Sequence, residues 1–394
     1  MRTVCLVGAF ISFIGCLCPY GRTDEVNTAK LVSANTDFGL NLFEKLIEQN
    51  SGKNIFISPT SIAIALEMTY NGALGETQKA MADILELQGM NLHDLNKANA
   101  ALMAMLGNLD DDVQLNIANS LWANKEIPFK SDFLKRNEEF YHAKVSNLDF
   151  GDPATSQKVI NDWVSEKTIG KIDKIVEDGE IDMDAVLFLI NAVYFKGSWA
   201  VKFDKEYTRD RDFTLLDGSK KKVPMMASIS KSFGSYFEDG FEAVSLPYGS
   251  GKVRMYIFLP NTDSSLEKFI KNLNAKNWKD WMSKFREEEV AVILPKFKLE
   301  YEVNLNNSLK ELGMGIAFSH DANFKGMCQR DSLIDKVKHK TFVDINEEGT
   351  EASSATSVKM KKNGGYVIIN HPFFCVIRDD TTGAILFMGC IVEP

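Results

Sequence analysis

Residues 347–365 read EEGTEASSATSVKMKKNGG, and this stretch is the most informative in the chain. It is small and polar, it contains few bulky side chains, and segments with strand character lie on both sides of it. Such a composition is typical of a surface loop. A plain disordered loop is one interpretation, and the order of its residues favours a second.

The order of these residues separates charged from uncharged side chains. In a strand, successive side chains point to opposite faces. One face would carry Thr350, Ala352, Ser354, Thr356 and Val358, and the other would carry Glu351, Ser353, Ala355, Ser357 and Lys359. The first face has no charge, so the segment suits both an exposed loop and a sheet position with one buried face. A slip by one residue would bury Glu351 and Lys359, which disfavours other registers.

The rest of the chain predicts an α+β protein with large sheets and one domain, because there is no linker or internal repeat. Apolar spacing predicts a helix over 35–47, capped by Asn35 or Thr36, and a second helix that Ser58-Pro59 opens and Met68 ends. The apolar run 185–195 indicates a strand buried on both faces, with Asn191 as a hydrogen-bonded core amide. Further strands are predicted at 253–259, 290–294 and 366–369, and a hairpin at 373–377 and 384–392.

Composition and motifs exclude several function classes. The net charge of −9 argues against nucleic acid or an anionic membrane as the main partner. The chain has no G-x-S-x-G, H-E-x-x-H, C-x-x-C or P-loop motif, and its five histidines are scattered. We therefore expect no enzyme activity, no metal and no cofactor.

The N-terminus has a separate character. Residues 1–20 combine a basic start with an apolar run, as in a secretory signal peptide, and 21–394 would be the mature domain. The run is short for a transmembrane anchor. The sequence Phe13-Ile14-Gly15-Cys16 also suits a bacterial lipoprotein signal, in which Cys16 is lipidated. We expect a secreted protein, with a lipid anchor at a bacterial envelope, and hence membrane contact, as the alternative. Cys328, Cys375 and Cys390 remain, which is no disulfide framework.

Residues 347–352 resemble the hinge of the serpins, the serine protease inhibitors, and further motifs of that family follow in its order. These motifs are Asn54–Ile62, Asn161–Val164 with Gly170–Ile172, Asn191–Trp199, Val223–Met226, Leu294–Phe297, His371–Phe373 and Leu386–Gly389. The resemblance covers about residues 30 to 394. It implies three β-sheets, eight or nine α-helices and an exposed reactive loop.

The resemblance also implies a mechanism and a partner. A serine protease cuts the loop and forms an acyl-enzyme, the freed loop enters the central sheet as a new strand, and the protease is distorted before it deacylates. We expect the chain itself to be a monomer. A non-inhibitory serpin that serves as carrier, chaperone or storage protein is the alternative, and an enzyme is a remote one. The small residues Ala352, Ser353, Ser354 and Ala355 favour the inhibitor, because non-inhibitory members often have bulky or charged residues there.

Residue roles follow from the same resemblance. Ser58, Ser61, Asn191 and His339 match the shutter, the polar cluster beneath the sheet where it opens. Trp199 and Lys296 match the breach, where the loop enters first, and Glu347 matches the partner of that lysine. Gly349 and Thr350 match the hinge, with Glu351 and the four small residues after it.

The scissile bond is less well defined. Counting from Glu347 places it after Asn363, and counting back from Pro372 places it near Lys361. Lys362 is preferred over Lys361, and both over Asn363, because lysine suits trypsin-like proteases; a cut at Met360 or Val358 by a chymotrypsin-like or elastase-like protease is the alternative. Residues 98–115 contain Asp110-Asp111-Asp112 and no basic cluster, so we expect no heparin-type cofactor. Glycosylation of Asn306 is left open.

Overall fold

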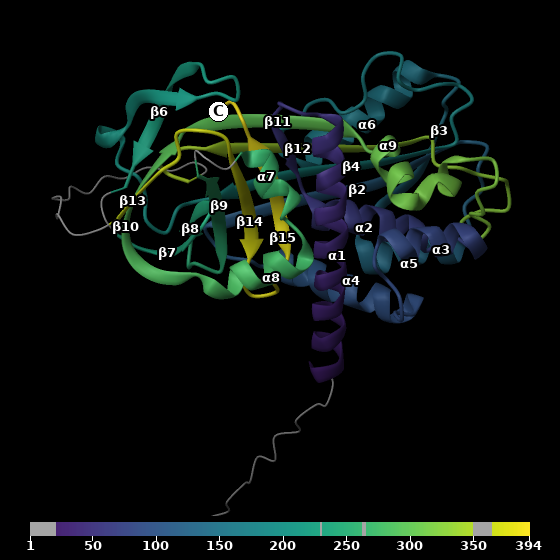
Figure 1. The fold of residues 1–394 in the computed structure, drawn as a ribbon. Helices are drawn as coiled ribbons and strands as arrows, with labels where there is room; N and C mark the ends of the chain where they lie inside the picture. The colour runs from purple at the N-terminus through teal and green to yellow at the C-terminus, as the bar shows by residue number, and fades with distance from the viewer. Residues whose placement is uncertain (1–20, 229–230, 262–264, 350–364) are drawn as a thin grey trace, which may run out of the picture.

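The computed structural model describes residues 21–228, 231–261, 265–349 and 365–394. One of the two sheets that these residues form has five strands. Figure 1 shows this sheet across the middle of the molecule, with helices around it and β6, β10 and β13 at one end. The α-helices are α1 (Gly21–Gln49), α2 (Pro59–Tyr70), α3 (Gly75–Ile84), α4 (Leu92–Leu106), α5 (Ser131–Tyr141), α6 (Pro153–Lys167), α7 (Leu266–Lys271), α8 (Ala275–Lys284) and α9 (Asn306–Leu309).

The five-stranded sheet contains the long apolar strand that the sequence predicts. Its order is β11 (Phe297–Asn304), β12 (Lys336–Ile345), β4 (Leu187–Gly197), β2 (Val113–Asn124) and β3 (Lys144–Leu148). β12 and β4 are parallel neighbours, and β2 is antiparallel to β4. These two pairings place β4 at the centre of the sheet.

The remaining strands form a ten-stranded sheet with two parts. The first part is β1 (Ile55–Ile57), β15 (Ile385–Ile391), β14 (Phe373–Asp379), β9 (Val253–Pro260), β8 (Phe241–Tyr248) and β7 (Lys231–Glu238). The second part is β6 (Lys220–Ala227), β5 (Arg209–Thr214) and β13 (Gly365–Ile368). β10 (Arg286–Pro295) joins them, since residues 286–290 pair with β7 and 293–295 pair with β6. The three expected sheets are the five-stranded sheet and these two parts.

Alternate residues of β4 belong to two different cores. Leu187, Leu189 and Val193 pack in the main core with α2, α4 and the ten-stranded sheet. Phe188, Ile190, Ala192 and Tyr194 pack in a smaller core with α6 and the segment after it. This division confirms that the strand is buried on both faces, and it defines a core face and an α6 face of the sheet.

The first helix differs from its predicted start. Helix α1 already contains residues 21–34, so Asn35 and Thr36 lie inside it and cap nothing. Leu31 and Val32 are buried and extend the apolar face toward the N-terminus. The hydroxyl of Thr36 donates to the carbonyl of Val32 at 2.8 Å, which satisfies a polar side chain within the helix. The second helix is confirmed, with Pro59 as its first residue.

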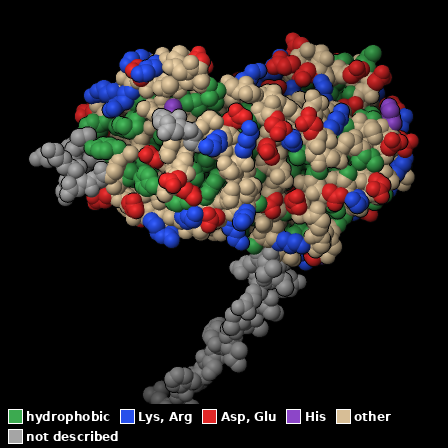
Figure 2. Space-filling view, viewed as in Figure 1, with side chains coloured by type: hydrophobic (Ala, Val, Ile, Leu, Met, Phe, Trp, Pro, Cys, Tyr) green, Lys and Arg blue, Asp and Glu red, His purple; other side chains and the backbone are tan. Residues whose placement is uncertain are grey.

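Other surface and core features complete the fold. Within the described residues, no helix has the length and apolar character needed to cross a bilayer. Cys328, Cys375 and Cys390 are free and buried, and burial raises the pKa of the Cys375 and Cys390 thiols. Figure 2 shows acidic and basic side chains interspersed over the face that it displays.

Candidate functional site

The central feature of the site is the seam between β12 and β4. The two strands pair directly and in parallel from Lys336 opposite Phe188 to Phe342 opposite Tyr194. This ladder ends three residues before the end of each strand, at Ile345 and at Gly197. The seam is therefore closed along most of its length and lacks direct pairing at one end.

Gly349 lies at that end, between the two diverging strands. It forms antiparallel bridges with Asn346, which directly follows β12, and with Ser198, which directly follows β4. The backbone hydrogen bonds between Asn346 and Gly349 measure 3.1 and 3.2 Å. Gly349 thus occupies the position of the first residue of an additional strand between β12 and β4.

Only glycine fits this position. Its φ of +104° lies in a region that side chains disfavour. A Cβ atom there would lie 2.2 Å from the carbonyl oxygen of Gly197 and 2.4 Å from the backbone nitrogen of Trp199. Both the backbone angle and the lack of space explain the glycine of the hinge.

Glu347 anchors the turn that leads to Gly349. The residue is 4% exposed, and its Oε2 lies 3.0 Å from Nζ of Lys296 while its Oε1 accepts a hydrogen bond of 2.9 Å from Thr208. Burial acts to raise the pKa of Glu347, but the hydrogen bonds from Lys296 and Thr208 outweigh it, and the pKa lies below its ordinary value. The carboxylate is therefore charged and paired at neutral pH.

Trp199 fixes the other side of the same turn. Its ring stacks on Tyr248 with centroids 4.2 Å apart, and its indole nitrogen donates to the carbonyl of Asn346 at 2.8 Å. Its backbone nitrogen donates to the carbonyl of Glu348 at 3.0 Å. The expected breach residues Trp199, Lys296 and Glu347 therefore meet at the open end of the seam.

A row of polar side chains crosses the sheet on its core face. Asn119 of β2 lies opposite Asn191 of β4, which lies opposite His339 of β12. The amide nitrogen of Asn191 donates to Asn119 and to Ser61, and its oxygen bonds to Nδ1 of His339. The row is buried and lies against the start of α2. Three of the four expected shutter residues, Ser61, Asn191 and His339, thus meet through their side chains. The fourth, Ser58, joins them through its backbone nitrogen, which donates to His339.

His339 is held neutral in a defined tautomer. Its Nε2 accepts a hydrogen bond of 3.0 Å from the backbone nitrogen of Ser58. Nδ1 therefore carries the proton and donates to Asn191. Burial lowers the pKa of His339 to about 3, and the adjacent helix N-terminus also disfavours a positive charge. The hydrogen bond from His339 to Asn191 spans the seam itself.

Two residues of the site were not expected from the sequence. Asn119 lies in β2, where polar and apolar residues are mixed, and Thr208 lies in a polar segment before β5. Asn119 is one of several polar residues of β2, with Gln114, Asn116 and Ser120 nearby, so the sequence gives no signal that singles it out. Thr208 offers none, because its role depends on a contact with a residue 139 positions away.

Some of the predicted site residues lie in the part of the chain that the structure does not describe. Thr350, Glu351, Ala352, Ser353, Ser354 and Ala355, and the scissile candidates Lys361, Lys362 and Asn363, lie outside the described residues. In the described parts of the chain, no group of three or more His, Cys, Asp or Glu side chains is placed to hold a metal ion. Asn306, whose glycosylation stays a prediction, donates to the carbonyl of Asp335 and accepts from the nitrogen of Val337.

Comparison with known proteins identifies this architecture. The family model described as "Serpin (serine protease inhibitor)" matches residues 33–394. The chain belongs to the serpin family. Among curated relatives, serpin B6 of Pongo abelii is 38% identical over 374 residues, which cover 92% of this serpin and 99% of the relative. The leukocyte elastase inhibitor of Bos taurus is 36% identical and covers 93% of this serpin and 100% of its own length.

Solved serpin structures agree with this fold. The native state of the thermophilic serpin tengpin superimposes with a TM-score of 0.86 at 32% identity, covering 93% of this serpin and 94% of tengpin. Human thyroxine-binding globulin, in a ligand complex, also gives a TM-score of 0.86, at 27% identity and with 93% and 99% coverage. Because a relative named as an inhibitor and a thyroxine-binding globulin both resemble this chain, the fold alone does not distinguish inhibition from ligand transport.

Proposed function

We propose that this serpin inhibits a serine protease by covalent trapping: cleavage within residues 350–364 releases a strand that inserts between β12 and β4. The position of Gly349 carries this proposal. It is already bridged to residues at the ends of both strands, so the hinge marks the start of a sixth strand. The five-stranded sheet corresponds to the state before insertion.

The register of the hinge supports the same direction of insertion. If the pairing of Asn346 with Gly349 continues antiparallel along β12, Thr350 falls opposite Ile345, and Ala352, Ser354 and Thr356 fall opposite Val343, Thr341 and His339. These residues of β12 are buried on the core face. The uncharged face of the loop would therefore be the buried face, and Glu351 would lie on the α6 face.

The energetics favour the inserted state. Insertion replaces the single ladder between β12 and β4 with two ladders. Each net hydrogen bond contributes about 1 kcal/mol, so about ten additional bonds exceed the effect of a typical mutation several times over. The native state would then be a kinetic trap that cleavage releases.

The target protease is proposed from the loop sequence. Lys362 and Lys361 suit a trypsin-like enzyme, whereas Met360 or Val358 would suit a chymotrypsin-like or elastase-like one. Some relatives are named leukocyte elastase inhibitors, which keeps the second class in the test. We propose a trypsin-like target, with Lys362 preceding the scissile bond.

The leader suggests where the inhibitor acts. Residues 1–20 have the composition of a signal peptide and precede the family match, which begins at residue 33. We propose secretion of a monomeric inhibitor, with lipidation of Cys16 as the alternative. Fractionation of the culture followed by mass spectrometry of the N-terminus distinguishes the two. A secreted chain would be recovered from the medium, whereas a lipidated chain would begin at Cys16 and stay with the membrane fraction.

The test of the proposed function is incubation with a panel of serine proteases of trypsin-like, chymotrypsin-like and elastase-like specificity. We expect a complex of inhibitor and trypsin-like protease that survives SDS, together with loss of protease activity. A carrier or storage serpin would give only a cleaved chain and an active protease. That result with every protease in the panel would contradict the proposal.

A further inference from the structure

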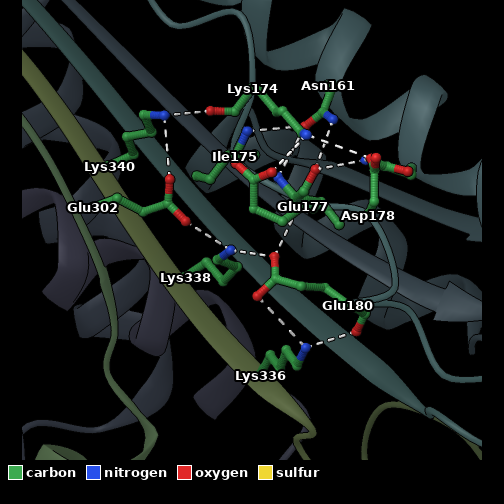
Figure 3. Close-up of polar contacts among 12 residues, drawn as sticks. Asn161, Lys174, Ile175, Glu177, Asp178, Glu180, Glu302, Lys336, Lys338 and Lys340 are labelled. Atoms are coloured by element: carbon green, nitrogen blue, oxygen red, sulfur yellow. Dashed lines mark hydrogen bonds and ion pairs between the residues drawn. The ribbon is translucent and has the colours of Figure 1, made fainter.

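Three lysines line the α6 face of β12 beside the seam. Lys336, Lys338 and Lys340 alternate along the strand, opposite Phe188, Ile190 and Ala192 of β4. Lys338 and Lys340 are only 2% and 6% exposed, which is unusual for lysine. Figure 3 shows the three side chains directed toward the segment that connects α6 to β4.

This connecting segment, residues 168–186, is fastened to β12 through the lysines. The carboxylate of Glu180 binds Nζ of Lys338, and its backbone carbonyl accepts a hydrogen bond of 2.7 Å from Lys336 (Figure 3). Lys340 donates to the carbonyl of Lys174 at 2.5 Å. The contacts extend over five residues of β12, 336–340, and hold the connection across the strand.

The other partners of the lysines come from β11. Nζ of Lys338 lies 2.8 Å from Glu302, and Nζ of Lys340 lies 2.7 Å from Glu300 and 3.2 Å from Glu302. These bonds lie on the side of β12 away from the seam. If β12 and β11 move aside together, the bonds to β11 are kept, whereas the bonds to Glu180 and Lys174 must stretch or break.

The connection is also fastened to α6. The side-chain oxygen of Asn161 accepts hydrogen bonds from the backbone nitrogens of Ile175 and Val176 at 2.9 and 3.0 Å. Its amide nitrogen donates to the carbonyl of Val176 at 2.9 Å. Helix α6, the connection and β12 are therefore linked as a strap over the α6 face of the seam.

The two ends of the seam differ in the polar contacts that hold β12 and β4 together. At the breach end, direct pairing stops three residues early. At the opposite end, the carboxylate of Asp335 accepts from the backbone nitrogens of Val186 and Leu187, in addition to the Glu180 contacts nearby. If the seam opens from the breach, the contacts of Asp335 and Glu180 are therefore the last that must break.

We propose that Glu180 is the latch residue of this strap. Its bonds to Lys338 and Lys336 hold the α6–β4 connection on β12, and they limit the rate at which β12 and β4 separate in the half of the seam far from the breach, at residues 336–340 and 187–192. The inference deepens the proposed function, because full strand insertion requires this half to open. The latch acts on the seam of the intact protein, so it can be measured without any protease.

The experiment compares Glu180→Gln with Glu177→Gln by hydrogen exchange of the intact protein. Glutamine at 180 keeps an acceptor for the nitrogen of Glu177, which bonds to Glu180 at 2.7 Å, but it loses the charge. Glu177 makes an exposed ion pair with Lys174 on the same connection and is the matched control. We expect backbone amides of residues 187–192 and 336–340 to exchange about tenfold faster in Glu180→Gln, and unchanged exchange in Glu177→Gln.

Two further results complete the test. If Glu180→Gln does not fold, Lys336→Gln removes the neighbouring bonds from a partly exposed lysine and should raise exchange in the same segments. In a protein that traps protease, Glu180→Gln should also consume fewer inhibitor molecules per trapped protease. Equal exchange in Glu180→Gln, Lys336→Gln and Glu177→Gln would overturn the latch. Faster exchange with no complex in any protein, including the wild type, would retain the latch and overturn the proposed function.

Discussion

His339 of β12 and Asn191 of β4 lie directly opposite each other and are hydrogen-bonded across the seam. The same Asn191 side chain bonds to Asn119 on the next strand and to Ser61 at the start of α2. A strand that enters between β12 and β4 must break the contact between His339 and Asn191. This single bond therefore couples the protonation of one histidine to the integrity of the sheet.

The first prediction concerns pH. The pKa of His339 is about 3 in the folded protein, against about 6.5 in an unfolded chain. Between these values the unfolded chain binds the proton and the folded protein does not. Neutral His339 therefore makes its full contribution to the free energy of unfolding above pH 6.5. As the pH drops from 6.5 toward 3, the free energy of unfolding falls by up to about 1.4 kcal/mol per pH unit. Urea unfolding at a series of pH values measures this slope.

His339→Gln tests whether His339 causes this dependence of the free energy of unfolding on pH. It should be less stable at neutral pH, and its stability should vary less between pH 6.5 and 3. His93→Gln, at an exposed position of α4, is the control and should keep the slope of the wild type. Identical slopes in all three proteins would mean that His339 does not stay neutral in the folded state.

A second prediction concerns the breach. Glu347→Gln removes the charge that Lys296 pairs with and should lower the free energy of unfolding by about 1 kcal/mol, a modest value because Lys296 is partly exposed. Loss of the pair should also speed exchange of the backbone nitrogens of Trp199 and Phe203, which bond to residues 348 and 347. The exposed Glu206→Gln is the control, and equal stability of the two variants would refute this role.

A third prediction concerns the face of the loop that becomes buried. Thr350→Arg places a charge on the core face of the inserting strand, at a cost of several kcal/mol when it is unpaired. The variant should fold, be cut and release active protease. Glu351→Arg places the same side chain on the α6 face and should still trap. Both variants are incubated with the same protease, and an SDS gel shows whether a covalent complex forms. A complex with Thr350→Arg would contradict the assigned register.

The agreement between sequence and structure depends on the range of the interactions involved. The run 185–195 is predicted well, because burial of β4 on both faces leaves a local apolar signal. The predicted cap at Asn35 or Thr36 was wrong, because the helix begins at Gly21 and Leu31 and Val32 extend its buried face. The contact between Lys338 and Glu180 joins residues 158 positions apart in the sequence, and no local sequence pattern predicts such a contact. Sequence motifs identify the hinge, whereas only the fold shows that Gly349 is paired on both sides.

A fourth prediction concerns the scissile bond. Mass spectrometry of the C-terminal peptide released by a trypsin-like protease should show a start at Asn363, or at Lys362 for the second candidate. A start at Gly364 would instead identify Asn363 as the residue before the cut and a different protease class. Starts at Lys361 or Lys359 would identify Met360 or Val358, as expected for a chymotrypsin-like or elastase-like target.

The most direct test of strand insertion is the melting temperature before and after the loop is cut. Cleavage of an ordinary loop loosens the chain and leaves the melting temperature unchanged or lower. Here the cut should free the segment after Gly349 to pair with both β12 and β4, so the cleaved protein should melt at a clearly higher temperature than the intact protein in the same buffer. An equal or lower melting temperature after cleavage would show that the loop does not insert.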